Sequence, residues 1–279
     1  MKNFESGWEN KEGIKFYVRG WEPSEKPKAV VALVHGHGEH VGRYVHVGKA
    51  FTKAGYVLIG FDLRGHGKSG GPRGHTSSYD ALLDDMSDFL AQVSRRYPKL
   101  PKFIYGHSLG GNLVLNFTLR RKPEVAGAIV TAPWLKLAFK PSAVQVTLAR
   151  IMNKIAPGFT QNSKLDTTAL SHDAKVVKAY NEDSLVHDKV SARLYAGIHD
   201  SGIWALEHAA EFPIPLLIMH GTADRLTSAQ ASREFSERSG KKVTWRAWEG
   251  WYHEIHNEPD KAEALKVMTA WMNARIKKK

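Results

Sequence analysis

One serine in this chain lies where its hydroxyl could act as a nucleophile. Ser108 is the middle residue of Gly106–Gly110, between a β-like apolar run at 102–105 and a helix-like run at 111–117. A strand, a tight turn and a helix in this order lift a serine hydroxyl above a sheet, because small flanking residues let the backbone turn sharply. The pentapeptide alone is a weak signal, since glycine and serine are common residues. The helper groups must therefore be found elsewhere in the chain.

A carboxylate in a suitable position follows a later apolar run. Hydrolysis through a serine requires a general base, a carboxylate that orients this base, and N–H donors for the oxyanion. When the serine turn belongs to an α/β sheet, the chain order is serine, acid, histidine. Residues 215–220 are typical of a buried parallel strand, and Asp224 lies in the turn after it. Because such sheets place catalytic groups at the carboxyl ends of their strands, we expect Asp224 to be the acid.

Two histidines compete for the role of general base. The last predicted strand, 243–248, leads into a loop that contains both His253 and His256. We favour His253 because it lies nearer the strand end, and His256 is the alternative. A metal site at these two histidines is less well supported, since no clear set of further ligands accompanies them.

Two backbone N–H groups are expected to hold the oxyanion. One belongs to Leu109, the residue after the nucleophile, and the other to the loop after an early strand. That loop is His35–His40, whose glycines permit the turn that directs an amide at the substrate. We assign the second donor to the backbone of His37. Each such amide typically contributes about 3 kcal/mol of transition-state stabilisation.

A second glycine-rich segment, 65–70, matches the letters of the dinucleotide-binding fingerprint but not its setting. Residues 68–74 are typical of a loop and not of an opening helix, and the acidic residues downstream lie inside a helix-like stretch. The phosphate-loop pattern also fails, because Asp62 stands where its first glycine belongs. We expect these glycines to shape a loop beside the site.

Composition limits the class of protein. The chain has 279 residues, 42% of them hydrophobic, which suffices for one large α/β domain. It contains no cysteine, so disulfides and thiol catalysis are excluded and the redox compartment stays open. The first ten residues lack an apolar core segment, and no apolar run reaches the ~20 residues of a membrane-spanning helix. We expect a cytoplasmic protein.

The charge is strongly positive. The net charge is +12, from 40 Lys and Arg against 28 Asp and Glu, and three lysines end the chain. The simpler interpretation is a solubilising surface with a cationic tail. The functional interpretation is peripheral attraction to an anionic membrane. Nucleic acid is the weaker candidate, because no basic–aromatic motif accompanies the charge.

Strand-like and helix-like runs alternate, which predicts a largely parallel sheet wrapped by helices. The predicted strands are 14–18, 29–35, 56–62, 102–106, 125–132, 215–220 and 243–248. The predicted helices are 43–54, 77–96, 109–121, 229–236 and 259–276. Residues 134–200 contain no convincing strand. We therefore expect a cap inserted between two parts of one core, 1–133 and 201–279.

Within the predicted cap, apolar residues recur at helical spacing and are surrounded by basic residues. They are Val144, Leu148, Ile151, Met152 and Ile155. Two interpretations stay open. The helix packs on the main domain by this face, or it forms a lid whose apolar face meets a membrane or an acyl chain.

With these residues placed, the chain resembles α/β-hydrolases of the monoacylglycerol lipase and lysophospholipase group over nearly its whole length. The motifs that carry the resemblance are His35–His40 with Gly42–Tyr44, Asp62–Ser69, Gly106–Gly111, Ala132–Pro133, Asp183–Val186, His220–Asp224 and Tyr252–Glu254. The resemblance implies an eight-stranded, mostly parallel sheet with a helical cap between strands six and seven. It also implies that the protein is a serine hydrolase, which cleaves monoacylglycerols to fatty acid and glycerol through an acyl-enzyme and needs no metal or organic cofactor.

Other activities of the same fold stay open. A lysophospholipase or a general short- or medium-chain carboxylesterase would use the same triad. A non-catalytic ligand-binding member of the fold is disfavoured, because such proteins usually lose a triad residue and Ser108, Asp224 and His253 are all present.

The resemblance assigns residues outside the triad as well. Glu39 and Arg43 match positions that help to order the polar end of the site, and Tyr180 resembles a cap residue that contacts glycerol. The chain departs from the family at His37, where members often carry a small residue, and at Leu109, where many have methionine. Neither change disturbs a backbone donor, but His37 could alter the acyl or alcohol pocket.

Overall fold

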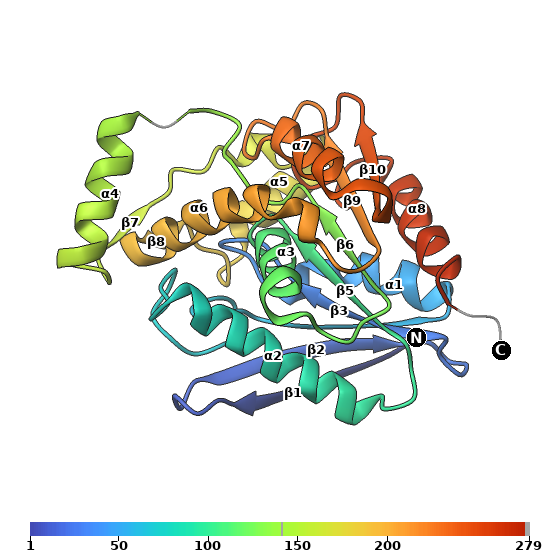
Figure 1. The fold of residues 1–279 in the computed structure, drawn as a ribbon. Helices are drawn as coiled ribbons and strands as arrows, with labels where there is room; N and C mark the ends of the chain where they lie inside the picture. Colours follow the sequence, from blue (N-terminus) through green and yellow to red (C-terminus); the bar gives the residue numbers. More distant parts are fainter. Residues whose placement is uncertain (141, 277–279) are drawn as a thin grey trace.

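A sheet of eight strands forms the centre of the protein (Figure 1). The computed structural model describes residues 1–140 and 142–276. The strand order is β1-β2-β4-β3-β5-β6-β9-β10, in which β2 pairs antiparallel with β1 and β4 and all other neighbours are parallel. The strands are β1 (Lys2–Glu9), β2 (Lys15–Glu22), β3 (Ala29–Val34), β4 (Tyr56–Phe61), β5 (Lys102–His107), β6 (Gly127–Thr131), β9 (Leu216–Gly221) and β10 (Val243–Trp248). The predicted eight-stranded, mostly parallel α/β-hydrolase sheet is confirmed.

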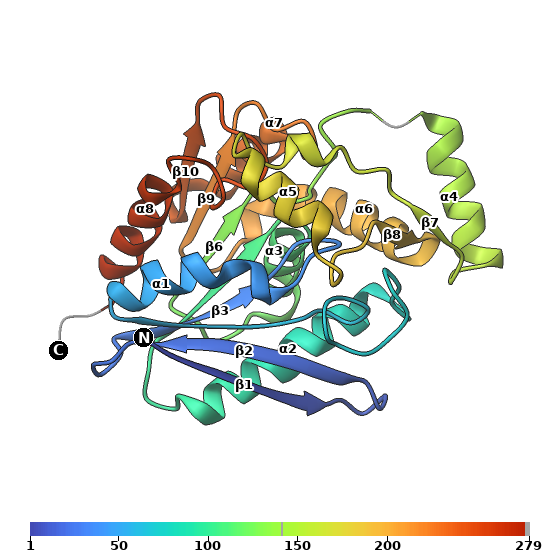
Figure 2. The same ribbon diagram turned by 180° about the vertical axis from the view of Figure 1, so that it is seen from behind.

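Helices cover both faces of this sheet (Figures 1 and 2). One face carries α1 (Val45–Lys53) and α8 (Lys261–Asn273). The other carries α2 (Tyr79–Arg96), α3 (Leu109–Arg121), α6 (Ala192–Glu207) and α7 (Ala229–Ser239). Short 3₁₀ helices, η1 (Val41–Tyr44), η3 (Ala209–Glu211) and η4 (Gly240–Lys242), join them to the strands. Every residue of β3 and β4 is buried, which explains their continuous apolar sequence.

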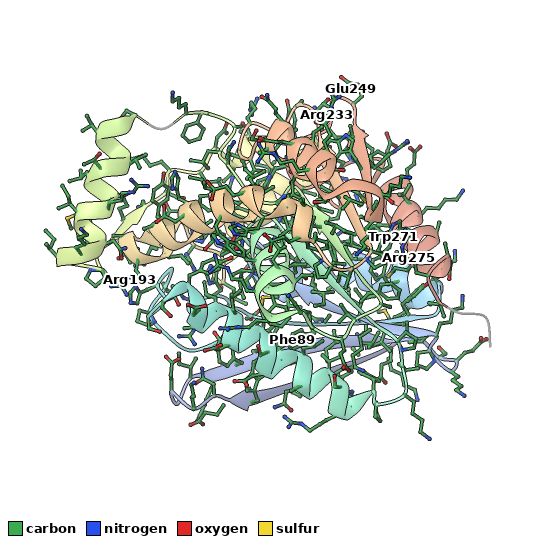
Figure 3. All side chains as sticks on the ribbon, viewed as in Figure 1. Phe89, Arg193, Arg233, Glu249, Trp271 and Arg275 are labelled. Carbon is green, nitrogen blue, oxygen red and sulfur yellow. The ribbon has the colours of Figure 1, made fainter. Side chains whose placement is uncertain are left out.

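Aromatic side chains pack on both faces of the sheet, among them Phe89 and Trp271, which Figure 3 labels. Phe89 of α2 packs on Phe61 of β4 with ring centroids 4.5 Å apart. Trp271 of α8 contacts Phe103 of β5 from the opposite face at 6.2 Å. The central strands are thus packed on both faces, which fixes the positions of the loops at their carboxyl ends.

The insertion between β6 and β9 contains α4 (Ala143–Ile155), β7 (Thr160–Asn162), η2 (Thr167–Ala169), α5 (Ala174–Glu182) and β8 (Lys189–Ser191). The expectation of no strand here was wrong, because β7 and β8 form an antiparallel ribbon. Each is three residues long and gives no readable alternation. The expected boundary at residue 200 falls inside α6, which packs along α3. The edge strand β1 was also not predicted, because it is largely exposed.

Helix α4 stands at the margin of the molecule, away from the sheet (Figure 1). Four of the five residues of its predicted apolar stripe are exposed: Val144 by 77%, Leu148 by 57%, Ile151 by 48% and Ile155 by 72%. Phe139 and Phe159, on either side of the helix in sequence, are exposed too. The stripe therefore does not pack into the core of the main domain.

Candidate active site

Ser108 lies on a tight turn between β5 and α3. Its φ of 52° and ψ of −114° place an ordinary side chain in a strained region of backbone space. A Cβ on Gly106 would lie 2.3 Å from the carbonyl oxygen of Gly110, and one on Gly110 would lie 2.0 Å from that of Val34. Only glycine fits at either position. The glycines of the pentapeptide are thus required for the close approach of three backbone segments that forces the serine outward.

Asp224 lies in the turn after β9, and its carboxylate is surrounded by hydrogen-bond donors. Oδ1 accepts the backbone N–H of Leu226 at 2.7 Å and of Thr227 at 3.1 Å. Oδ2 lies 2.7 Å from Nδ1 of His253. Burial by itself would raise the pKa of Asp224, but the charge of His253 and the hydrogen bonds from His220 and His253 outweigh burial and hold this pKa well below its usual value. Asp224 is therefore ionised at neutral pH.

The structure brings His253, and not its rival His256, to this carboxylate. Burial lowers the pKa of His253, but the charge of Asp224 and the hydrogen bond to it dominate and raise the pKa above its ordinary value. The ring of His256 instead stacks on Tyr44 with centroids 4.8 Å apart. Neither ring nitrogen of His256 has a partner among the described residues. The geometry thus separates two histidines that the sequence left as alternatives.

Ser108 and His253 open into the same cavity of about 830 Å³. Its polar end is formed by the loops after β3, β5 and β10, and its remaining wall comes largely from the inserted segment. Apolar side chains line this wall: Trp134, Leu137, Phe139, Leu148, Met152, Phe159, Leu165, Leu170, Val190 and Leu226. A volume of this size lies within the range of small-molecule sites.

The two predicted oxyanion donors belong to the serine turn and to the loop after β3, and both segments contribute residues to the cavity. Leu109 is the first residue of α3, and an N–H in the first turn of a helix has no acceptor inside the helix. His37 lies in the loop after β3, where the preceding N–H, that of Gly36, is fixed by Oε1 of Glu39 at 2.7 Å. The ring of His37 packs edge-on against Trp134 at 6.3 Å. Burial lowers its pKa to about 3, so this ring is neutral at pH 7.

Arg43 is held between two buried carboxylates. Its Nη1 donates to Glu39 at 2.7 Å, and its two terminal nitrogens donate to both oxygens of Glu254 at 2.7 and 2.8 Å. The guanidinium also lies 4.7 Å from the ring centre of Tyr180. Sequence reasoning missed Glu254, although it lies beside His253 in one of the quoted motifs. The structure therefore places Glu39, Arg43 and Tyr180 together, but the guanidinium is occupied by carboxylates.

The inserted segment is tied to the catalytic loops by backbone and side-chain bonds. The N–H groups of His253 and Glu254 donate to the carbonyls of Ala169 and Leu170 at 3.3 and 2.8 Å. A second tie joins His40, in the loop after β3, to Asp183 at 2.8 Å. The insertion thus covers the site through contacts with the same loops that carry its chemistry.

The glycine segment 65–70 closes around a carboxylate. Oδ2 of Asp62 accepts the N–H of Lys68 at 2.8 Å, and a Cβ on Gly67 would lie 2.1 Å from the same oxygen. The amide that a phosphate loop would offer to an anion is directed at Asp62. Within the described residues, no group of three or more His, Cys, Asp or Glu side chains could hold a metal ion.

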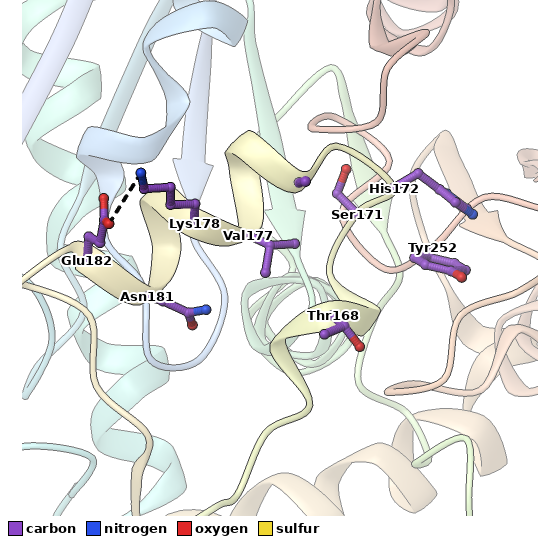
Figure 4. Close-up of a pocket in the computed structure, with 9 residues that line it drawn as sticks. Thr168, Ser171, His172, Val177, Lys178, Asn181, Glu182 and Tyr252 are labelled. Atoms are coloured by element: carbon purple, nitrogen blue, oxygen red, sulfur yellow. Dashed lines mark ion pairs between the residues drawn. The ribbon is translucent and has the colours of Figure 1, made fainter.

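A second, shallower cavity of about 650 Å³ lies between α5 and the loop of Tyr252 (Figure 4). It contains Ser171 and His172, and His172 pairs with Glu258 at 3.1 Å. This set does not form a triad, because the hydroxyl of Ser171 donates to the backbone carbonyl of Asn257 at 3.0 Å.

Comparison with known proteins agrees with this architecture. Residues 25–260 match the family model described as serine aminopeptidase, S33. The chain belongs to this hydrolase family. The hydrolase is 34% identical over 266 residues to a monoacylglycerol lipase of Mycolicibacterium smegmatis, covering 95% of each chain. It is 38% identical to an uncharacterized abhydrolase domain-containing protein of Dictyostelium discoideum, covering 93% of the hydrolase but only 28% of that longer protein. The crystal structure of the Paleococcus ferrophilus monoacylglycerol lipase matches with a TM-score of 0.86 and 32% identity, covering 93% of this chain and 99% of that one.

Proposed function

We propose that this chain is a carboxylic ester hydrolase that cleaves monoacylglycerols to a fatty acid and glycerol. One observation carries the proposal. The strained turn of Ser108 and the Asp224–His253 pair both open into one largely apolar cavity. An apolar cavity with a few polar groups at one end suits a single acyl chain with a polar head. The similarity to monoacylglycerol lipases supports the same substrate class.

The proposed reaction proceeds through an acyl-enzyme. His253 accepts the proton of Ser108 as its hydroxyl attacks the ester carbonyl, and Asp224 holds the imidazole in the tautomer whose free nitrogen faces the serine. The backbone N–H groups of His37 and Leu109 stabilise the oxyanion. His253 then protonates the leaving alcohol and activates the water that releases the fatty acid.

Each end of the substrate has a distinct proposed position. The acyl chain occupies the apolar wall of the cavity, beside Trp134, Met152 and Phe159. The glycerol lies near Tyr180, which is on the cavity wall close to Glu39. Since the guanidinium of Arg43 is taken by two carboxylates, we assign Glu39 and Arg43 to the support of this polar end and Tyr180 to the contact with the alcohol.

We also propose that the inserted segment is a cap whose α4 side touches an anionic membrane surface. Its exposed apolar side chains, with exposed basic residues such as Lys140 and Lys154 nearby in sequence, have the character of an interfacial helix. No helix among the described residues is long and apolar enough to cross a bilayer. The contact would therefore be peripheral.

The proposal is tested by Ser108→Ala and a substrate panel. We expect the variant to keep its fold and lose both monoacylglycerol hydrolysis and labelling by a fluorophosphonate probe. Comparison of monoacylglycerol with lysophospholipid and p-nitrophenyl esters then defines the head-group preference. Full turnover by Ser108→Ala would refute the nucleophile, and faster turnover of lysophospholipid would refute the substrate.

A further inference from the structure

One oxygen of Asp224 receives more donors than a simple triad requires. Oδ2 lies 2.7 Å from Nδ1 of His253, 2.8 Å from Nε2 of His220 and 2.9 Å from Oγ1 of Thr227. His220 is fully buried near the end of β9, four residues before Asp224. Because Asp224 is ionised, the facing Nε2 of His220 must carry a proton.

The ring of His220 is anchored at both nitrogens. Its Nδ1 lies 2.8 Å from Oγ of Ser232, a fully buried residue of α7. The strand fixes the backbone of His220 and the helix fixes the far side of its ring. The N–H that reaches Asp224 therefore has a set direction.

Thr227 also approaches this oxygen, but its hydroxyl has a competing acceptor. Its hydroxyl has one proton and two acceptors, Oδ2 of Asp224 at 2.9 Å and the carbonyl of Ala132 at 3.1 Å. The Nε2 proton of His220 faces the carboxylate at 2.8 Å, and the other acceptor near it, Oγ1 of Thr227, lies farther away at 3.4 Å. Apart from His253, His220 is therefore the main hydrogen-bond donor to Oδ2 of Asp224.

We propose that His220 is a positioning residue of the triad, which fixes Oδ2 of Asp224 and shares its negative charge with His253. The inference rests on the proposed function, because it needs the Ser108–His253–Asp224 mechanism. His220 is absent from the lining of the 830 Å³ cavity, so it acts through Asp224 and not on the substrate.

Sharing the charge has a measurable consequence at the base. If the donor from His220 is removed, more of the carboxylate charge falls on Nδ1 of His253, and the imidazolium becomes more stable. The acidic limb of kcat/KM, which reports protonation of His253, then moves to higher pH.

Other groups also face His253 and stay in place in this test. They are Asp224 after β9, Glu254 in its own loop, Glu39 after β3, His107 at the end of β5, the buried His256, and the backbone carbonyl of Ala169 from the cap. Among these groups Asp224 is the one hydrogen-bonded to His220, and its Oδ2 loses that donor. The other groups stay as they are, so a shift of the limb reports the missing donor.

The test compares three variants by the pH dependence of kcat and KM on a soluble p-nitrophenyl ester. We expect His220→Phe to move the acidic limb of kcat/KM upward by about half a pH unit or more. Its kcat should fall at least about tenfold at unchanged KM, since alignment and not binding is lost. His220→Gln keeps an N–H of similar reach and should restore both values to near those of the wild type. Leu217→Ala, a fully buried change on the same strand, should lower Tm without moving the limb.

The outcomes separate the possible explanations. An unmoved limb in His220→Phe, or one that Gln does not restore, would overturn the positioning role, whatever happens to Tm. If His220→Phe does not fold, the flexible His220→Met replaces it in the same comparison. Activity of Ser108→Ala would instead overturn the proposed function, so the two failures are distinguishable.

Discussion

Nη1 of Arg43 lies 2.7 Å from a carboxylate oxygen of Glu254, the residue directly after His253. Arg43 belongs to η1, which follows the loop after β3, and Glu254 belongs to the loop after β10. This ion pair therefore joins two loops of the site that are far apart in sequence. Both side chains are buried. The loop that carries His253 is therefore fixed to the segment that follows the predicted oxyanion donor, His37.

We expect Arg43→Met to lower the free energy of unfolding by about 3–5 kcal/mol, because it leaves the carboxylates of Glu39 and Glu254 buried without their cation. Urea denaturation measures this change. Arg233→Met is the matched control, since its ion pair with Glu237 is exposed and should contribute less than about 1 kcal/mol. Equal effects of the two substitutions would contradict the assigned role of the buried pair.

The glycines of the serine turn give a second prediction. Gly110→Ala places a Cβ 2.0 Å from the carbonyl oxygen of Val34. We therefore expect the free energy of unfolding to fall by at least about 2 kcal/mol and esterase activity to be lost. Gly158→Ala is the control, because the nearest atom to its added Cβ is 3.9 Å away. Thermal melts and turnover of a p-nitrophenyl ester test the pair. A Gly110→Ala enzyme with wild-type Tm would refute the steric argument.

Sequence predicted the parts of this molecule that depend on local pattern. The buried strands β5 and β9 and the turns of Ser108 and Asp224 follow from apolar runs that end in glycine-containing loops. The strand before His253, β10, is largely exposed and was predicted from a mixed run. Contacts between distant side chains could not be predicted in this way. Glu254 meets Arg43 across 211 positions, and no periodicity encodes that distance.

His220 illustrates the same limit at shorter range. It belongs to a motif quoted for the acid, yet only the structure places its Nε2 on Asp224 and its Nδ1 on Ser232. The ribbon of β7 and β8 was missed for a different reason. Each strand is three residues long and is fixed by pairing with the other, so neither has a readable pattern of its own.

The neutral ring of His37 gives a prediction for pH. Burial lowers its folded pKa from 6.5 to about 3, while the unfolded chain binds a proton below pH 6.5. Stability is therefore lost as pH falls from 6.5 toward 3, by about 1.4 kcal/mol per pH unit for this one group. His37→Leu removes the group, so its unfolding free energy should fall less steeply over that range. Denaturation at several pH values checks the slopes, and identical slopes would contradict the account.

A substitution at Tyr180 should affect binding of the alcohol part of the substrate and not binding of its acyl chain. No described residue forms a hydrogen bond with its hydroxyl, so this group is available for the proposed contact with glycerol. We expect Tyr180→Phe to raise KM for a monoacylglycerol about two- to tenfold, as for loss of one hydrogen bond, and to leave KM for a p-nitrophenyl ester unchanged. Tyr195→Phe, which changes another tyrosine of the cavity wall, is the control. Equal shifts with both substrates would place the glycerol elsewhere.

The exposed face of α4 gives the prediction for membrane binding. Ile151 and Ile155 are exposed and, unlike Leu148, do not line the cavity, so their replacement tests the surface alone. We expect Ile151→Asp and Ile155→Asp each to weaken binding to anionic vesicles at least about tenfold, because a buried isoleucine contributes about 1.5–3 kcal/mol. Turnover of a soluble p-nitrophenyl ester should stay unchanged.

The control for this prediction is Ala270→Asp, which adds the same charge to an exposed position of α8 on the other side of the protein. Vesicle sedimentation at low and high salt distinguishes the two contributions, since attraction of the basic surface to anionic lipid is screened by salt and apolar insertion is not. If Ala270→Asp weakens binding as much as Ile155→Asp, net charge and not α4 would account for the attraction. Unchanged binding in all three variants would exclude this face of the cap as the site of membrane contact.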